Sequence, residues 1–179
     1  AVWLDQEWTS AYAFYQFWLN VMDADAIKLL KIFTFLTREE IETLEQELAE
    51  KPFLRSAQKT LAHQVTKIVH SEDIANKVRD VSQALFGSDE LGDLDGEVLK
   101  SAAQALPNVD AGQVEDLPQA LVATELVSSM GAARRAIAEG GVYVNNKKVD
   151  SEELDKTQQL PGNVMIIRRG KKSLAAIVF

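Results

Sequence analysis

Residues 121–149 read LVATELVSSMGAARRAIAEGGVYVNNKKV, and the periodicity of this stretch changes after Gly140-Gly141. Before the glycines, apolar residues recur at helical spacing, in two short runs. After them, Val142, Val144 and Val149 flank Asn145-Asn146, which is a hairpin turn signal because asparagine tolerates positive φ. The stretch therefore predicts two short helices followed by a β-hairpin.

A second hairpin is predicted downstream. Apolar residues fill 164–167, a turn is expected near Gly170, and the chain returns through Leu174 to Phe179. Upstream, Pro118 suits the first turn of a helix. Residues 117–179 are thus predicted to form a small α/β domain with two helices and a short-stranded sheet.

The first half of the chain has helical patterning. Thr9 or Ser10 can cap a first helix, and Thr37 begins a capping box, in which a hydroxyl and a carboxylate satisfy the free amides of a first turn. Gly87 suits the end of the last helix. We expect an all-helical domain over 1–87.

Between these two parts the composition changes. Glycine and aspartate recur in 88–116, Pro107 and Gly112 interrupt the chain, and a short helix is expected over 97–106. We interpret 88–116 as a partly helical linker. The predicted fold class is α+β, with an N-terminal all-helical domain, a linker and a small C-terminal α/β domain.

The charge distribution distinguishes the ends of the chain. Residues 129–179 hold nine of the 19 basic residues and five of the 27 acidic ones, a net charge of +4. The earlier part holds the remaining 10 and 22, a net charge of −12. The total charge of −8 argues against nucleic-acid binding by the chain as a whole. The asymmetry of charge, however, indicates separate modules with separate partners.

Several classes of protein are disfavoured by composition. The sequence has no run of about 18 apolar residues, no basic signal region at its start and no cysteine. His63 and His70 share a helical face without a carboxylate cluster, so structural roles are favoured and no metal site is predicted. We expect a cytoplasmic protein.

The basic residues of the C-terminal domain fall into three clusters. They are Arg134 and Arg135 on the second helix; Lys147 and Lys148 at the first turn, beside Asn145 and Asn146; and Arg168, Arg169, Lys171 and Lys172 at the second turn. Short elements can bring such clusters onto one face, which would follow RNA phosphates and stack arginine on unpaired bases. The alternative is a set of solvated hairpin tips.

Residues 121–149 resemble the RNA-binding domain first described in the fourth protein of the ribosomal small subunit. The similarity lies in the A-R-R helix start, G-G-V, the β-branched strand and the V-N-G turn with basic neighbours. Asn146 replaces the usual glycine of that turn, a mild departure since asparagine also adopts the left-handed conformation. The resemblance implies RNA binding without specifying the RNA.

The helical half closely resembles the helical domain of bacterial tyrosyl-tRNA synthetases. The similarity lies in TSAYAFYQFWLNVMDADAIKLLKIFTFLTREEIETLE (9–45), AQKTLAHQVTKIVHSED (57–73) and ALFG (84–87), and IIRRGKKSLAAIVF at the C-terminus resembles the end of that family. The resemblance implies binding of the anticodon stem-loop and long variable arm of tyrosine tRNA, which positions it for ATP-dependent tyrosylation.

The class I catalytic domain of that family, which binds ATP and tyrosine, has no counterpart in this sequence. Neither an HIGH-like nor a KMSKS-like motif occurs, and in the family AVWLD (1–5) closely follows the KMSKS-like loop. The resemblance therefore implies a truncated chain without catalytic residues or a cofactor of its own, inactive alone. A homodimer is expected only of the full-length protein.

Two aspartates and three cations are candidate anticodon contacts. Asp23 and Asp25 begin a predicted helix, and capping is the favoured role of Asp23. A carboxylate there can also accept hydrogen bonds from a guanine, and the resemblance places this domain beside an anticodon whose first base is guanine or a derivative. Lys28, Lys31 and Arg38 are candidate phosphate contacts.

Six aromatic residues of the helical half are predicted to belong to its core, with base stacking as the alternative. They are Tyr12, Tyr15, Phe17, Trp18, Phe33 and Phe35. Two other functions remain open for the whole chain. One is a stand-alone RNA-binding protein with the same C-terminal domain, and the other is a helical interaction domain whose basic tail binds an acidic protein.

Overall fold

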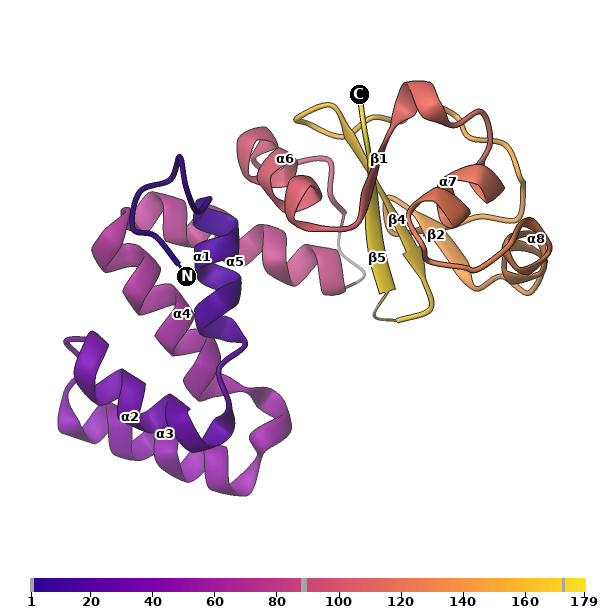
Figure 1. Ribbon diagram of the computed structural model, residues 1–179. Coiled ribbons are helices and arrows are strands. Elements are labelled where there is room, and N and C mark those ends of the chain that lie inside the picture. The colour runs from indigo at the N-terminus through magenta and orange to yellow at the C-terminus, as the bar shows by residue number, and fades with distance from the viewer. Residues whose placement is uncertain (1, 88–89, 172) are drawn as a thin grey trace. The chain divides into compact units, whose positions relative to one another are not determined.

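The computed structural model describes residues 2–87, 90–171 and 173–179. The chain divides into two compact units, Ala1–Arg79 and Asp80–Phe179, which we call the helical unit and the sheet unit (Figure 1). The predicted α+β class is confirmed. Within the described ranges, no helix has both the length and the apolar character that a membrane crossing requires.

The helical unit is organised around its fourth helix. Its elements are α1 (Ala11–Leu19), α2 (Asp23–Phe33), α3 (Arg38–Glu50), the 3₁₀ turn η1 (Pro52–Leu54), α4 (Ser56–Val69) and the start of α5 (Glu72–Phe86). α4 packs against α1, α2 and α3. Ala57, Leu61 and Val65 lie one helical turn apart on α4 and meet Phe14 and Leu30 in the core.

Side-chain caps begin two of these helices as predicted. Ser10 Oγ accepts from the Ala13 amide at the start of α1. Thr37 and Glu40 form the capping box of α3, with Glu40 Oε2 2.7 Å from the Thr37 amide nitrogen. These hydrogen bonds lower the pKa of Glu40, because they favour its ionised form.

The predicted capping role of Asp23 is wrong. α2 begins at Asp23 itself, and its N-cap residue is Met22, which makes no side-chain cap. A residue inside the first turn cannot cap its own helix. The carboxylate of Asp23 instead accepts a hydrogen bond of 2.5 Å from Nε2 of the buried Gln58, so it ties α2 to α4.

The core prediction for the aromatic residues holds for Tyr12 and Tyr15 and is wrong for three others. Phe17, Phe33 and Phe35 are 50%, 46% and 90% exposed. Phe35 lies in the loop between α2 and α3, where helical spacing does not apply. Phe17 and Phe33 flank the half-buried Trp18, with ring centroids 5.3 and 5.1 Å from it, in an aromatic cluster at the surface.

The sheet unit has five strands among its described residues. Its elements are α6 (Gly96–Ala105), β1 (Asn108–Asp110), the 3₁₀ turn η2 (Ala111–Gln113), α7 (Leu117–Ala123), α8 (Met130–Ala138), β2 (Val142–Val144), β3 (Lys147–Lys148), β4 (Val164–Arg169) and β5 (Ser173–Val178). The strand order is β1-β5-β4-β2-β3, and only the β1–β5 pair is parallel. Both predicted hairpins are present.

The stretch interpreted as a linker, 88–116, contributes α6 and β1 to the sheet unit. β1 pairs with β5 in the register Val109↔Ile177, and α6 packs against β4 and β5. α6 matches the helix expected there, whereas β1 is three residues long and its partner lies far along the chain. No local pattern indicates such a pairing.

We expect Thr37→Ala to lower the free energy of unfolding by about 1 kcal/mol, because it leaves amides of the first turn of α3 without an acceptor. Chemical denaturation followed by circular dichroism measures the change. Thr43→Ala is the control, since the Thr43 hydroxyl donates to the Glu39 carbonyl within the same helix and alanine favours helix. Equal losses in both variants would contradict the capping assignment.

Candidate nucleic-acid interface

The first predicted cluster lies on the outer face of α8. Ala133, Ala136 and Ile137 are buried in the core of the sheet unit, so Arg134 and Arg135 project outward and are exposed. Arg134 pairs with Glu152 at 3.1 Å, and both side chains are about half exposed. Such a pair contributes little to stability, but it offsets part of the charge that Arg134 offers to a phosphate.

The second cluster lies beyond the first hairpin turn. Asn145 and Asn146 have φ of 49° and 63°, which confirms the predicted turn. Lys147 and Lys148 follow directly as β3 and are exposed. The stem of Lys148 occupies the space that a side chain on Gly140 would need, so the glycine lets Lys148 lie along the start of β2.

The amides of the turn asparagines make hydrogen bonds within the protein. Asn145 Nδ2 donates to the Gln158 carbonyl at 2.6 Å, and Asn145 Oδ1 accepts from the buried Ile166 amide at 2.9 Å. Asn146 Nδ2 donates to the Ala84 carbonyl at 2.9 Å. These bonds hold the hairpin in place, and a contact of either residue with RNA stays a prediction.

The third cluster is divided between the two faces of the sheet. Arg168 and Arg169 end β4, and successive side chains of a strand point to opposite faces. Arg169 Nη1 donates to the Leu126 carbonyl in the loop between α7 and α8. The Arg168 guanidinium carbon lies 4.3 Å from the centre of the Tyr143 ring. The expected single basic face is therefore wrong for this pair.

The turn of the third cluster contains two further residues that are predicted to contact RNA, Lys171 and Lys172. Gly170 has φ of 64°, a conformation that glycine adopts without strain, and Lys171 beside it is exposed. Lys172 lies outside the described residues. The turn thus presents Lys171 to solvent next to the end of β4.

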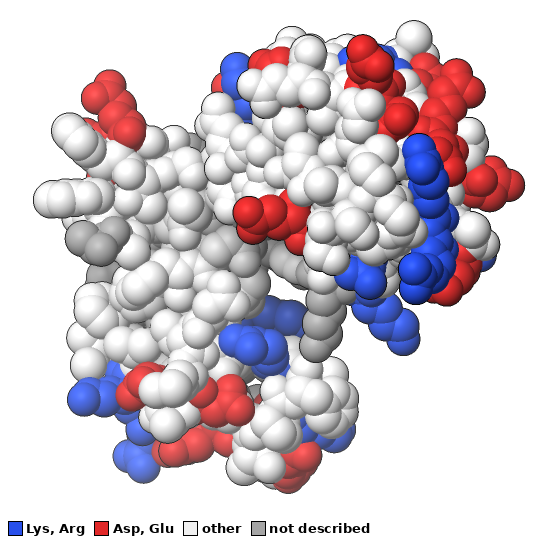
Figure 2. All heavy atoms as spheres, turned by 45° about the vertical axis from the view of Figure 1, so that its right-hand side comes forward, with Lys and Arg blue, Asp and Glu red and all other residues white. Residues whose placement is uncertain are grey.

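Four exposed cations of the three clusters make no side-chain hydrogen bond or ion pair among the described residues. They are Arg135, Lys147, Lys148 and Lys171. Figure 2 shows basic side chains gathered in a column along one side of the unit at the upper right, bordered by acidic side chains. Cations without partners are those that release counterions from a polyanion most effectively.

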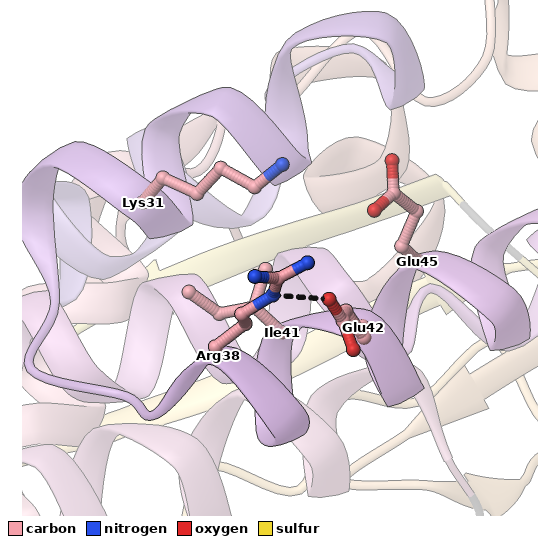
Figure 3. Close-up of a pocket in the computed structure, with 5 residues that line it drawn as sticks. All are labelled: Lys31, Arg38, Ile41, Glu42 and Glu45. Carbon is pink, nitrogen blue, oxygen red and sulfur yellow. Dashed lines mark hydrogen bonds and ion pairs between the residues drawn. The ribbon is translucent and has the colours of Figure 1, made fainter.

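The candidate anticodon contacts of the helical unit lie on α2 and at the start of α3. Asp25 and Lys28 are exposed. Lys31 and Arg38 line a pocket of about 580 Å³ between the two helices. In Figure 3, Lys31 extends across this pocket and Arg38 points into it toward Glu42, with Arg38 Nε 2.6 Å from Glu42 Oε1.

Carboxylates reduce the positive charge of that pocket. Glu42 and Glu45 of α3 line it together with Lys31, Arg38 and the apolar Ile41. The pocket therefore balances two cations against two anions, and a phosphate entering it would compete with Glu42 for Arg38.

The two histidines have structural partners. His63 Nε2 lies 3.0 Å from Asn76 Oδ1, and His70 Nδ1 lies 3.2 Å from Gln6 Nε2. The His70 ring meets Phe14 edge-on, and burial lowers the pKa of His70. Both rings belong to the packing of the helical unit.

Two family models match adjoining parts of the chain. A model described as tRNA synthetases class I (W and Y) matches residues 1–87. A model described as tyrosine–tRNA ligase SYY-like C-terminal domain matches residues 98–177. The chain belongs to the tyrosyl-tRNA synthetase family. It corresponds to a C-terminal portion of family members, as the resemblance implied.

Curated relatives extend this match along nearly the whole chain. The tyrosine–tRNA ligase of Leifsonia xyli is 49% identical over 99% of this chain and 40% of its own length, and that of Corynebacterium glutamicum is 44% identical over 99% and 43%. The chain thus spans about two fifths of these relatives. A crystal structure of a C-terminally truncated Aspergillus nidulans mitochondrial tyrosyl-tRNA synthetase is 35% identical, covering 46% of this chain and 24% of that one, with a TM-score of 0.45.

One residue of this synthetase family member was missed by sequence reasoning. Tyr143 lies between the buried Val142 and Val144 of β2, on the opposite side of the strand, and its ring contacts Arg168. The V-Y-V alternation is the signal that could have placed Tyr143 on the half-exposed face of the sheet.

We expect Asn145→Gly to lower the free energy of unfolding by about 1–3 kcal/mol, because it leaves the amide of the buried Ile166 without its acceptor while keeping the positive φ available. Chemical denaturation monitored by circular dichroism measures this loss. Lys147→Ala, at an exposed neighbouring position, is the matched control and should change stability by less than about 0.5 kcal/mol. A neutral Asn145→Gly variant would refute the role assigned to the amide.

Proposed function

We propose that this chain is the tRNA-recognition portion of a tyrosine–tRNA ligase and that it binds the anticodon stem-loop and long variable arm of tyrosine tRNA. The observation that carries the proposal is the set of unpaired cations, Arg135, Lys147, Lys148 and Lys171, on a unit that matches the C-terminal domain of this family. In a chain of net charge −8, such a local concentration of cations suits a polyanion whose main phosphate contacts lie on the sheet unit.

The contribution to the reaction is positioning. ATP and tyrosine would bind the catalytic part of the full-length enzyme, beyond the two fifths of the relatives that this chain spans. Contacts to the distant arms of the tRNA orient its acceptor end without touching the reacting atoms. Phosphate contacts from the basic turns would set the register, and a few base contacts would provide specificity.

The helical unit supplies candidates for those base contacts. Asp25 is exposed and makes no side-chain hydrogen bond among the described residues, whereas Asp23 is bound to Gln58. Phe35 is 90% exposed in the loop that joins α2 to α3, between the helices that carry Lys31 and Arg38. An exposed ring near cations is the combination that proteins use to stack unpaired bases.

Binding of three ligands tests the proposal. We expect the chain to bind tyrosine tRNA more tightly than the same tRNA with a changed anticodon, and both more tightly than heparin, because base contacts add to phosphate contacts. Fluorescence anisotropy at fixed salt measures all three. Equal binding of both tRNAs would favour a general RNA-binding protein, and equal binding of heparin would reduce the interface to a basic surface.

We expect Lys147→Ala with Lys171→Ala to flatten the salt dependence of tRNA binding, with the slope of log K against log salt falling by about one for each lost phosphate contact. Titrations at several salt concentrations measure the slope. Lys100→Ala, an exposed lysine on α6 outside the three clusters, controls for net charge alone. The Lys100 variant loses one charge and the double variant loses two, so a slope change half as large in the Lys100 variant would mean that binding follows overall charge.

A further inference from the structure

We propose that Tyr143 is a positioning residue, which holds the guanidinium of Arg168 ready for contact with an RNA phosphate. The inference rests on the proposed function. It adds to that function an uncharged residue, Tyr143, which affects RNA binding only through Arg168. It distinguishes Arg168 from Arg135, Lys147 and Lys171, which are exposed and make no side-chain hydrogen bond or ion pair among the described residues.

Strand register brings the two side chains together. Tyr143 of β2 and Arg168 of β4 are direct partners in the antiparallel pair, so they project from the same face of the sheet. The guanidinium carbon lies 4.3 Å from the ring centre, within the range in which a cation is attracted to an aromatic face. Both residues are partly exposed, so a ligand can approach the pair.

The hydrogen bonding of Arg168 indicates that the ring is what holds it. Nε of Arg168 is buried without a hydrogen-bond partner, which is unfavourable unless another contact compensates. Among the described residues, no carboxylate pairs with Arg168. No carboxylate among the described residues therefore offsets the charge that this guanidinium can offer to a phosphate, and the ring restricts its movement.

The other arginines of the clusters lack this combination. Arg134 is paired with Glu152, and Arg169 donates to the Leu126 carbonyl on the opposite face of the sheet. Arg135 is exposed on α8 without a supporting contact among the described residues. Immobilising a free arginine on a ligand has an entropic cost, and a guanidinium already restrained loses less freedom when it binds.

A mutant cycle on this chain with tyrosine tRNA tests the inference. We expect Arg168→Ala to weaken binding and reduce the salt slope by about one. Tyr143→Leu should raise Kd by about threefold to tenfold with the slope nearly unchanged, because the charge remains but is less well held. The variant carrying both changes should bind no more weakly than Arg168→Ala alone, since Tyr143 acts through Arg168.

Tyr143→Phe is the conservative variant, which keeps the ring and should bind like the parent protein. Melting curves check that each variant folds. If the leucine variant does not fold, Tyr143→Thr replaces it, because threonine suits a half-exposed strand position. Three results would overturn the inference: unchanged binding by Tyr143→Leu, equal losses in the phenylalanine and leucine variants, or additive losses in the cycle.

Failure of the proposed function and failure of the positioning role give different experimental results. If the parent protein does not prefer tyrosine tRNA over the anticodon-changed tRNA, that function fails, while the same cycle measured with either tRNA still reports whether Tyr143 and Arg168 are coupled. If the preference is present and the cycle is additive, the positioning role alone fails.

Discussion

The six-residue antiparallel pairing of β4 with β5 is the interaction on which the sheet unit depends. β1 joins the free edge of β5 and β2 joins the free edge of β4, so the position of every other strand follows from this pair. The pairing also determines which face each side chain occupies. Met165 and Ile167 thereby enter the core shared with α7 and α8, and Arg168 emerges on the other face, next to Tyr143.

Local signals in the sequence predicted local structure well. The capping box at Thr37, the turn at Asn145-Asn146 and both hairpins depend on residues a few positions apart, so their patterns are visible in the sequence. The β1–β5 pair and the Asp23–Gln58 hydrogen bond join residues far apart in the chain. Phe35 was misplaced because burial depends on which elements surround a loop, and spacing does not contain that information.

The candidate site shows the same division between local and distant effects. The three basic clusters were evident from composition. How well each arginine can contact RNA depends, however, on partner residues that lie outside its cluster. Glu152 pairs with Arg134, the Leu126 carbonyl engages Arg169, and the Tyr143 ring restrains Arg168. Neighbouring arginines with the same chemistry thus differ in mobility and available charge, and only the folded chain distinguishes them.

The place of β5 in the strand order constrains how the protein is made. Of the five strands among the described residues, β5 is the last to leave the ribosome, yet it lies between β1 and β4. Until residues 173–178 have emerged, the edges of β1 and β4 that pair with β5 stay unpaired. The buried Ala175 and Ile177 are then also missing from the core. The helical unit precedes all of these strands in the chain and can fold during translation, whereas the sheet unit completes its fold only after synthesis has passed β5.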